Sequence, residues 1–154
     1  MVRFYAIDCE MVENDLGKSM VARVSLVNEA LETVLDEYIK PTHHVADYRT
    51  SISGIKRGYE TEAKPKDEVV RRLKSIINGH VLVGFDVEKD LEALGISHSK
   101  VKDVATYQRY QISGQKQSLK KLAQQELRLS IQNGPHDSVE DAKAVMRIYN
   151  KDRF

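Results

Sequence analysis

The feature that most constrains this chain is an apolar run at residues 4–12 that carries two carboxylates, Asp8 and Glu10, one residue apart. Side chains alternate along a strand, so residues two apart share one side of the sheet, roughly 6.5–7 Å apart. Asp8 and Glu10 are therefore predicted to share a face, with Cys9 on the opposite one. Paired acids repel each other unless a cation such as Mg²⁺ or Mn²⁺ lies between them. A strand end that runs into solvent explains this stretch equally well.

Composition restricts the class of protein. The chain has 154 residues, of which 41% are hydrophobic and 31% charged, so we expect one soluble globular domain over residues 1–154. No apolar run is long enough to span a bilayer and no signal peptide is recognised, so we expect an intracellular protein without a membrane partner. The single cysteine, Cys9, excludes an internal disulfide, which suits a reducing compartment.

A net charge of +1 gives the chain no overall positive field, but basic residues gather at 98–128. Tyr107 and Tyr110 lie in this stretch, where only Asp103 and Glu126 are acidic. A solvated helix face and loop explains the pattern, and a groove for a phosphate backbone is the alternative. The seven basic residues are Lys100, Lys102, Arg109, Lys116, Lys120, Lys121 and Arg128.

The first third of the chain has the alternating pattern of strands. Residues 4–12, 20–27 and 33–39 are predicted strands, and the short turns between them favour an antiparallel meander of three strands. Polar residues dominate 43–58, which we interpret as a loop.

Helical periodicity begins after this loop. A helix is predicted from Lys66 or Asp67 to Gly79, followed by a short apolar strand at 81–84, which is typical of a parallel sheet covered on both faces. Three further helices are expected, the first capped by Asp86 and closed by Gly95, the second capped by Ser118, and the last starting near Ser138. The order predicts an α/β domain with a mixed sheet, an antiparallel meander plus parallel strands, flanked by helices.

Three more residues could carry chemistry. Asp90 lies about one turn into the helix after the strand at 81–84, and open α/β sheets bind ligands at such strand ends. Asp141 lies in the first turn of the last helix, where the helix dipole favours an acid. His136 precedes that helix, and its ordinary pKa of about 6.5 lets it take a proton at neutral pH. Taken singly, each has a purely structural explanation.

Together, Asp8, Glu10, Asp90 and Asp141 with His136 fit one chemistry. Four carboxylates can hold two divalent ions about 3.5–4 Å apart, which clamp the attacking and leaving oxygens of a phosphodiester displacement. The ions also offset the repulsion among the acids. A neutral imidazole can take the proton of the attacking water. This set of residues therefore predicts a two-metal phosphodiester hydrolase.

The same residues resemble a known family, the DEDDh branch of the DEDD exonucleases. The matching motifs are Ala-Ile-Asp-Cys-Glu-Met-Val at 6–12, Val-Gly-Phe-Asp through Asp90 at 83–90, and His136 with Asp141 five residues later. Segments 22–28, 47–50, 130–133 and 138–142 are similar to the branch that contains the interferon-stimulated 20-kDa exonuclease and RNA exonuclease 4. The resemblance runs from about residue 3 to residue 149.

The resemblance implies a ribonuclease H-like fold and 3′→5′ release of nucleoside 5′-monophosphates from single-stranded ends, with two divalent cations, Mg²⁺ or Mn²⁺. It implies that Asp8, Glu10 and Asp141 hold the metal on the nucleophile side. Asp8 would bridge to a second metal that Asp90 assists, and His136 would be the general base.

Two further positions follow from the resemblance. Met11 is similar to a residue that packs against the terminal nucleotide, and Arg49 to a position near the substrate. A surface ion pair is the alternative for Arg49. Phe85 stands where relatives often have His; it is not a proposed ligand, so this departure concerns packing or substrate preference.

The predicted partners are single-stranded RNA or DNA 3′ ends, with RNA favoured. The alternatives are a DNA-directed exonuclease of the same fold and a nucleic-acid-binding module without turnover, although such a module would not need His136. Relatives suggest a nuclear or nucleolar location, but no basic targeting run is present. The oligomeric state is not predicted.

Overall fold

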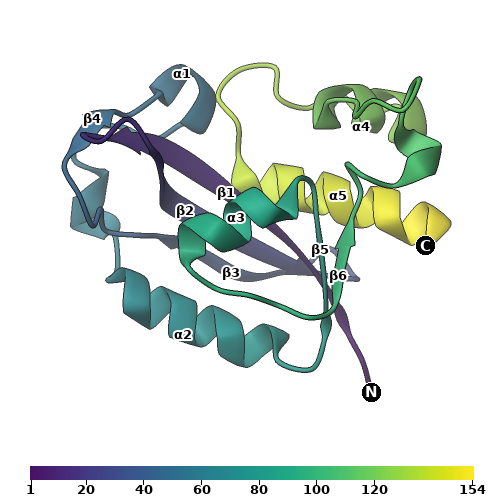
Figure 1. Ribbon diagram of the computed structural model, residues 1–154, viewed down its shortest axis with the longest axis horizontal. Helices are drawn as coiled ribbons and strands as arrows, with labels where there is room; N and C mark the ends of the chain where they lie inside the picture. Colours follow the sequence, from purple (N-terminus) through teal and green to yellow (C-terminus); the bar gives the residue numbers. More distant parts are fainter.

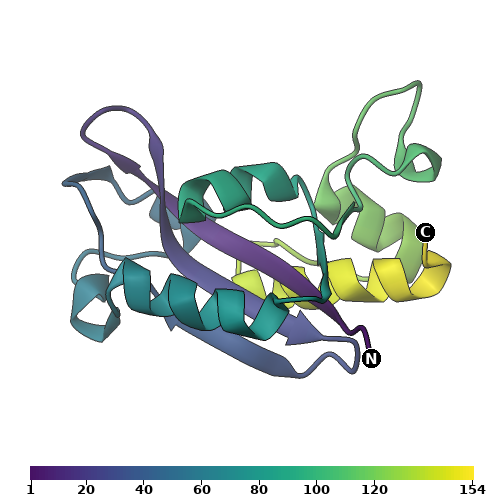
Figure 2. The same ribbon diagram turned by 60° about the horizontal axis from the view of Figure 1, so that its bottom comes forward.

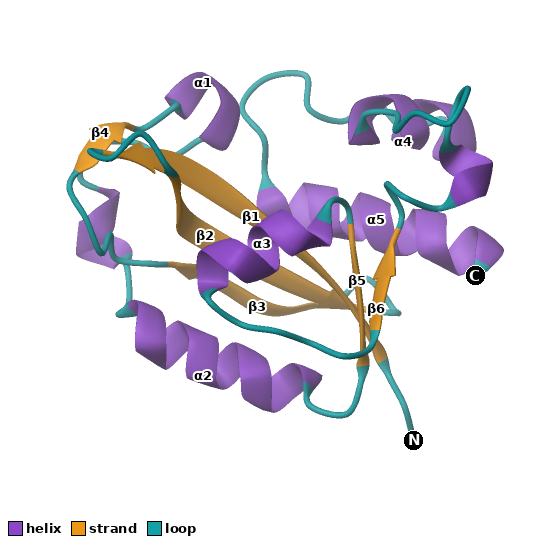
Figure 3. Cartoon of the chain, viewed as in Figure 1, coloured by secondary structure: helices purple, strands orange, loops and turns teal.

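The six-stranded sheet is built around β1 (Phe4–Asn14), which lies between β2 (Ser19–Asn28) and β5 (Val81–Gly84) in the computed structural model of residues 1–154 (Figure 1). The strand order is β3-β2-β1-β5-β6, where β3 is Thr33–Tyr38 and β6 is Val101–Asp103. β1 to β3 are antiparallel, whereas β5 and β6 run parallel to β1. Figure 3 shows how much longer the meander is than β5 and β6. The predicted meander and mixed sheet are confirmed.

Helices cover both faces of the sheet. α2 (Lys66–Ile77) and α3 (Val87–Leu94) pack on one face, and α4 (Leu119–Leu127) and α5 (Ser138–Asp152) on the other. These four helices match the predicted ones, including the Ser118 side chain that accepts a hydrogen bond from the Lys121 backbone N–H. None of the helices is both long and apolar enough to cross a membrane.

The alternation along β1 separates the two cores. Tyr5, Ile7 and Cys9 are buried on the side of α2 and α3, whereas Ala6 is buried on the side of α4 and α5. Asp8 shares the side of Ala6, because side chains two residues apart point the same way. Cys9 is therefore a small buried side chain without a disulfide, as predicted.

The segment 43–58 differs from the predicted loop. It contains β4 (Val45–Asp47), which pairs with the end of β1, and the short helix α1 (Thr50–Ser53). A 3₁₀ turn, Tyr59–Glu62, follows. These elements have three or four residues each, which is too short for a periodic pattern to form in the sequence. The strand β6 was missed for the same reason.

The start of α3 also differs from the prediction that Asp86 caps it. The Asp86 side chain pairs instead with Lys116, 2.7 Å from its Nζ, and makes no capping hydrogen bond. The carboxylate of Asp103, at the end of β6, accepts hydrogen bonds from the backbone N–H groups of Asp86 (3.0 Å) and Val87 (3.2 Å). It also accepts one from the Ala105 N–H at 2.9 Å. The cap of α3 therefore comes from the neighbouring strand.

Several residues of the basic stretch at 98–128 make ion pairs or packing contacts within the protein. Its segment between β6 and α4, which includes the 3₁₀ turn Gln108–Tyr110, projects beside the end of α5 (Figure 2). Arg109 pairs with Asp152 at 3.0 Å. Tyr110 is buried, and the Tyr107 ring stacks on Phe154 with ring centroids 3.8 Å apart. Both tyrosines therefore contribute to the packing on the α4 and α5 side of the sheet.

Replacing Asp103 by Ala is expected to destabilise the protein by about 1–3 kcal/mol, because three backbone N–H groups lose their acceptor. Asp103→Asn keeps one acceptor oxygen and should cost less. Urea unfolding measures both. Asp67→Ala, at an exposed acid of α2 that pairs with Arg71 at 3.7 Å, is the control and should change stability by less than about 0.5 kcal/mol. Equal stability of Asp103→Ala and Asp67→Ala would refute this role of Asp103.

Candidate active site

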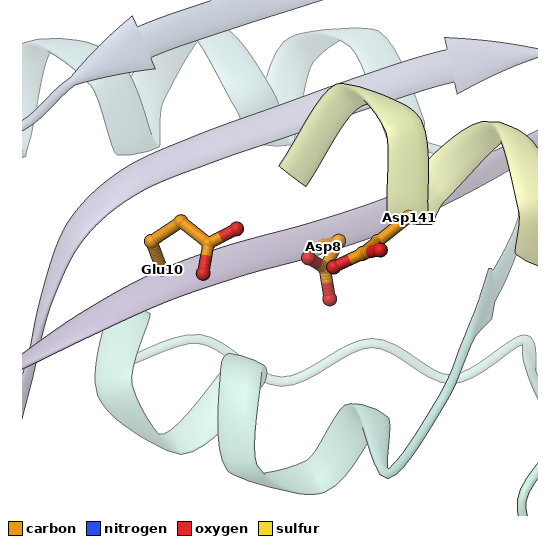
Figure 4. Close-up of side chains that lie close together, drawn as sticks. All are labelled: Asp8, Glu10 and Asp141. Atoms are coloured by element: carbon orange, nitrogen blue, oxygen red, sulfur yellow. The ribbon is translucent and has the colours of Figure 1, made fainter. Parts of the chain in front are cut away.

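Three acids meet where β1 passes the start of α5 (Figure 4). One oxygen each of Asp8, Glu10 and Asp141 lies within 4.8 Å of the other two. Asp8 and Glu10 project from β1 and Asp141 from the first turn of α5. Glu10 is 4% exposed and Asp141 2% exposed, whereas Asp8 is partly buried. The two ends of the chain thus contribute to one cluster of carboxylates.

The start of α5 is fixed over β1 by contacts with β2. Ser25 lies opposite Asp8 in the sheet, and its buried Oγ lies 2.6 Å from Oγ of Ser138, the first residue of α5. The Asp137 carboxylate caps α5 by accepting from the Val139 N–H at 2.9 Å. The serine pair was missed from the sequence, because two hydroxyls 113 residues apart leave no local signal.

Asp90 approaches the cluster from α3 and is 7% exposed. Burial raises the pKa of Asp8 well above its ordinary value, and the charge of Asp90 is the next largest cause. Burial also raises the pKa of Asp90 to about 8, with the charges of Asp103 and Asp86 adding to it. Asp90 is therefore part of the same electrostatic site, although none of its oxygens belongs to the 4.8 Å group.

The pKa values of the other two acids, Glu10 and Asp141, are also raised. Burial, followed by the charge of Asp141, raises the pKa of Glu10 to about 8, and Arg23 partly opposes this shift. Burial raises the pKa of Asp141 to about 6. Glu10 Oε2, Asp90 Oδ2 and Asp141 Oδ1 are buried without any hydrogen-bond partner.

Buried polar atoms without partners are rare in proteins, because desolvation costs several kcal/mol that a hydrogen bond or a cation must offset. Carboxylate oxygens are the ligands that hard divalent cations such as Mg²⁺ and Mn²⁺ prefer. The partnerless oxygens of Glu10, Asp90 and Asp141 therefore fit a divalent metal site.

His136 lies in the loop before α5 and is partly buried. Its backbone N–H donates to the carbonyl of Ile52 in α1 at 2.7 Å. Gly54, with φ +73°, lies against the His136 carbonyl, and a Cβ on Gly54 would be 3.3 Å from that oxygen. Burial, and then the charge of Lys120, lower the pKa of the His136 imidazole. Both effects favour the neutral imidazole, and α1 holds the backbone of His136.

Three further residues are singled out by the sequence, namely Met11, Arg49 and Phe85. Met11 is partly buried directly after Glu10. The Arg49 guanidinium pairs with Glu13 at 2.9 Å and donates to Ser19 Oγ at 3.1 Å, which is the surface ion pair that we considered as the alternative. Phe85 packs against the core under α4 and α5.

Comparison with known proteins places this arrangement in a family. A model of the exonuclease family matches residues 5–149. The chain belongs to this exonuclease family. Among related exonucleases, RNA exonuclease 4 of Aspergillus fumigatus is 40% identical over 98% of this chain and 51% of its own length. RNA exonuclease 4 of Candida glabrata is 44% identical over 96% of this chain and 59% of its own. The chain thus spans about half the length of the curated relatives it matches.

Solved structures give the fold. The Pan2 catalytic unit of Neurospora crassa superposes with a TM-score of 0.87 at 26% identity, covering 97% of this exonuclease chain and 26% of that one. The Saccharomyces cerevisiae Pan2 module in complex with AAUUAA RNA superposes with a TM-score of 0.86 at 26% identity, with 97% and 28% covered. The predicted ribonuclease H-like fold is confirmed.

The raised pKa values predict the pH dependence of stability in EDTA. Glu10 ordinarily has a pKa of 4.5 and here about 8, so between these values the folded state keeps a proton that the unfolded chain releases. Stability should therefore fall as the pH rises from about 5 to about 8, because the unfolded state then binds fewer protons.

Glu10→Gln removes this difference, so its melting temperature in EDTA should exceed that of the parent at high pH and fall less steeply with pH. Added Mn²⁺ should raise the melting temperature of the parent more than that of Glu10→Gln, since binding to the folded state stabilises it. Thermal unfolding across the pH range measures both effects. Equal stability of the parent chain at about pH 5 and about pH 8 would show that the pKa of Glu10 is not raised by folding.

Proposed function

We propose that the chain is a 3′→5′ exoribonuclease of the DEDDh type, which releases nucleoside 5′-monophosphates from single-stranded RNA ends with two divalent cations, Mg²⁺ or Mn²⁺. The proposal rests on the convergence of Asp8, Glu10 and Asp141 within 4.8 Å and on the partnerless oxygens around them. RNA as the substrate is supported by the names of the related RNA exonucleases and by the Pan2 module in complex with RNA.

The acids divide into two groups in this proposal. Asp8, Glu10 and Asp141 would hold one cation, and Asp8 with Asp90 the second. Bound cations would polarise the phosphate and offset the negative charge of the carboxylates. The burial of Glu10 and Asp141 fixes their side chains, so little reorganisation is required when the substrate enters.

His136 acts as the general base. Its neutral imidazole accepts a proton from the water that attacks phosphorus, while the bond to the 3′ oxygen of the preceding nucleotide breaks. The lowered pKa of His136 supports this role, because an imidazole that is already protonated cannot accept a proton. Its partly exposed position allows the proton to pass to solvent afterwards.

Met11 and Arg49 are the proposed substrate contacts. Met11 is only partly buried, so its apolar side chain would be accessible to pack against the terminal nucleotide. Arg49 can reach phosphate or ribose if its guanidinium exchanges Glu13 for the substrate.

An RNA oligonucleotide labelled at the 5′ end should shorten one nucleotide at a time in Mn²⁺, and a 3′ label should appear at once as mononucleotide. EDTA should stop the reaction. Asp8→Asn should reduce the rate by more than about a hundredfold, since losing outer partners of a metal ligand alone costs about 10- to 100-fold. Asp15→Asn, at an exposed acid of the β1–β2 turn, is the control and should keep the parent rate.

Gel electrophoresis of the products reads polarity and metal dependence together. RNA that is bound but never shortened would contradict the proposal and indicate a binding module. Faster digestion of a matched DNA strand in the same reaction would assign the activity to DNA instead.

Gly54→Ala should lower kcat about tenfold with little change in KM, because the new Cβ would press on the His136 carbonyl and displace the base. The matched control is Gly79→Ala, whose φ is +78° and whose Cβ would meet no atom within 4 Å. Both variants carry similar backbone strain, so a common loss of stability affects both. Steady-state kinetics on a short RNA separates kcat from KM. Equal kcat values for the two variants would show that α1 does not position His136 for catalysis.

A further inference from the structure

A cationic cavity of about 520 Å³ lies beside Met11, where the β1–β2 hairpin, the start of α2 and the end of α3 meet on the left of Figure 1. Three lysines line it, Lys18 from the hairpin, Lys66 from α2 and Lys89 from α3. Hydrogen-bonding side chains complete the wall, namely Asn14, Ser19, Thr42 and His43. The volume is in the range of ligand sites, about 300–1,000 Å³.

The charges of Lys18 and Lys66 have no acidic partner in an ion pair. None of the three lysines forms an ion pair, and Glu92 is the single acid in the wall of the cavity. In the basic stretch at 98–128, Lys116 and Arg109 pair with Asp86 and Asp152. The wall beside Met11 therefore carries positive charge that no ion pair holds.

The cavity shares two elements with the acid cluster. Met11, in its wall, directly follows Glu10 on β1. Lys89 directly precedes Asp90 on α3. The wall of the cavity and the acid cluster are therefore built in part from the same strand and the same helix.

We propose that this cavity binds phosphate groups of the single-stranded RNA whose end is cleaved, with Lys18 and Lys66 as the main contacts. The inference rests on the proposed function and adds the surface that holds the strand. Lysine binds phosphate as a point charge, and the hydroxyl and amide groups of the wall can donate to phosphate or ribose oxygens. The wall has no aromatic ring except that of His43. Binding should therefore depend on charge, with little preference for base sequence.

The test compares Lys18→Gln/Lys66→Gln with Lys74→Gln/Arg71→Gln, which removes the same charge at exposed side chains of α2 outside the cavity. Lys89 is left unchanged because its charge acts on Asp90. Fluorescence anisotropy measures the affinity for a 5′-labelled 20-nucleotide RNA in EDTA at several salt concentrations. Because each lost phosphate contact on a single strand changes the slope of log K against log salt by about 0.7, the cavity variant should show a slope about 1.4 smaller.

The cavity variant should also bind the RNA about tenfold more weakly than the control variant. In Mn²⁺ its KM should rise more for the 20-nucleotide RNA than for a dinucleotide, which is too short to fill both sites. Equal affinity and equal salt slope for the two double variants would overturn the proposal, and so would a KM increase independent of RNA length. If the parent released no mononucleotides, the proposed function would fail, whereas the binding comparison in EDTA would still decide whether the cavity holds RNA.

Discussion

The constraint on which this structure depends is the mutual repulsion of carboxylates that are buried together. Asp8, Glu10, Asp90 and Asp141 are all held at pKa values above their ordinary ones, and burial is the largest cause for each. A cluster of this kind opposes folding wherever its members are ionised. The packing of the rest of the domain must therefore supply enough favourable free energy of folding to offset the repulsion within the acid cluster.

The two cores supply that free energy from opposite faces of the sheet. The face that packs on α2 and α3 fixes Asp90, and the face that packs on α4 and α5 fixes Asp141. β1 lies between the two cores, and the charges of Asp90 and Asp141, one from each layer, both act on Asp8. Polar contacts then set the details, since the buried Ser25–Ser138 pair fixes the start of α5 and Asp103 fixes the start of α3. The site is thus assembled at the boundary between two cores, and small shifts in either would separate its acids.

The sequence predicts the long elements and the acids, but it does not predict the contacts that hold them. The periodic patterns of β1 to β3 and of the four main helices are long enough to identify, and Asp8 and Glu10 stand out because their spacing matches a strand. β4, α1 and β6 have three or four residues each, so no period could develop. The sequence predicts Asp86 as the cap of α3, because Asp86 is the local candidate. The true acceptor, Asp103, is 17 residues away from Asp86 and becomes its neighbour only when β6 pairs with β5.

The link between α1 and the loop before α5 is made by main-chain atoms, because the Ile52 carbonyl accepts from the His136 N–H. Such a contact does not depend on the side chains of α1 or of the loop before α5. Both segments can therefore change in sequence among relatives while the distance between their backbones is kept. Covariation of residue types would then be blind to this coupling. The coupling would instead constrain the number of residues in the connecting segments, because their lengths decide whether the two backbones can come into contact.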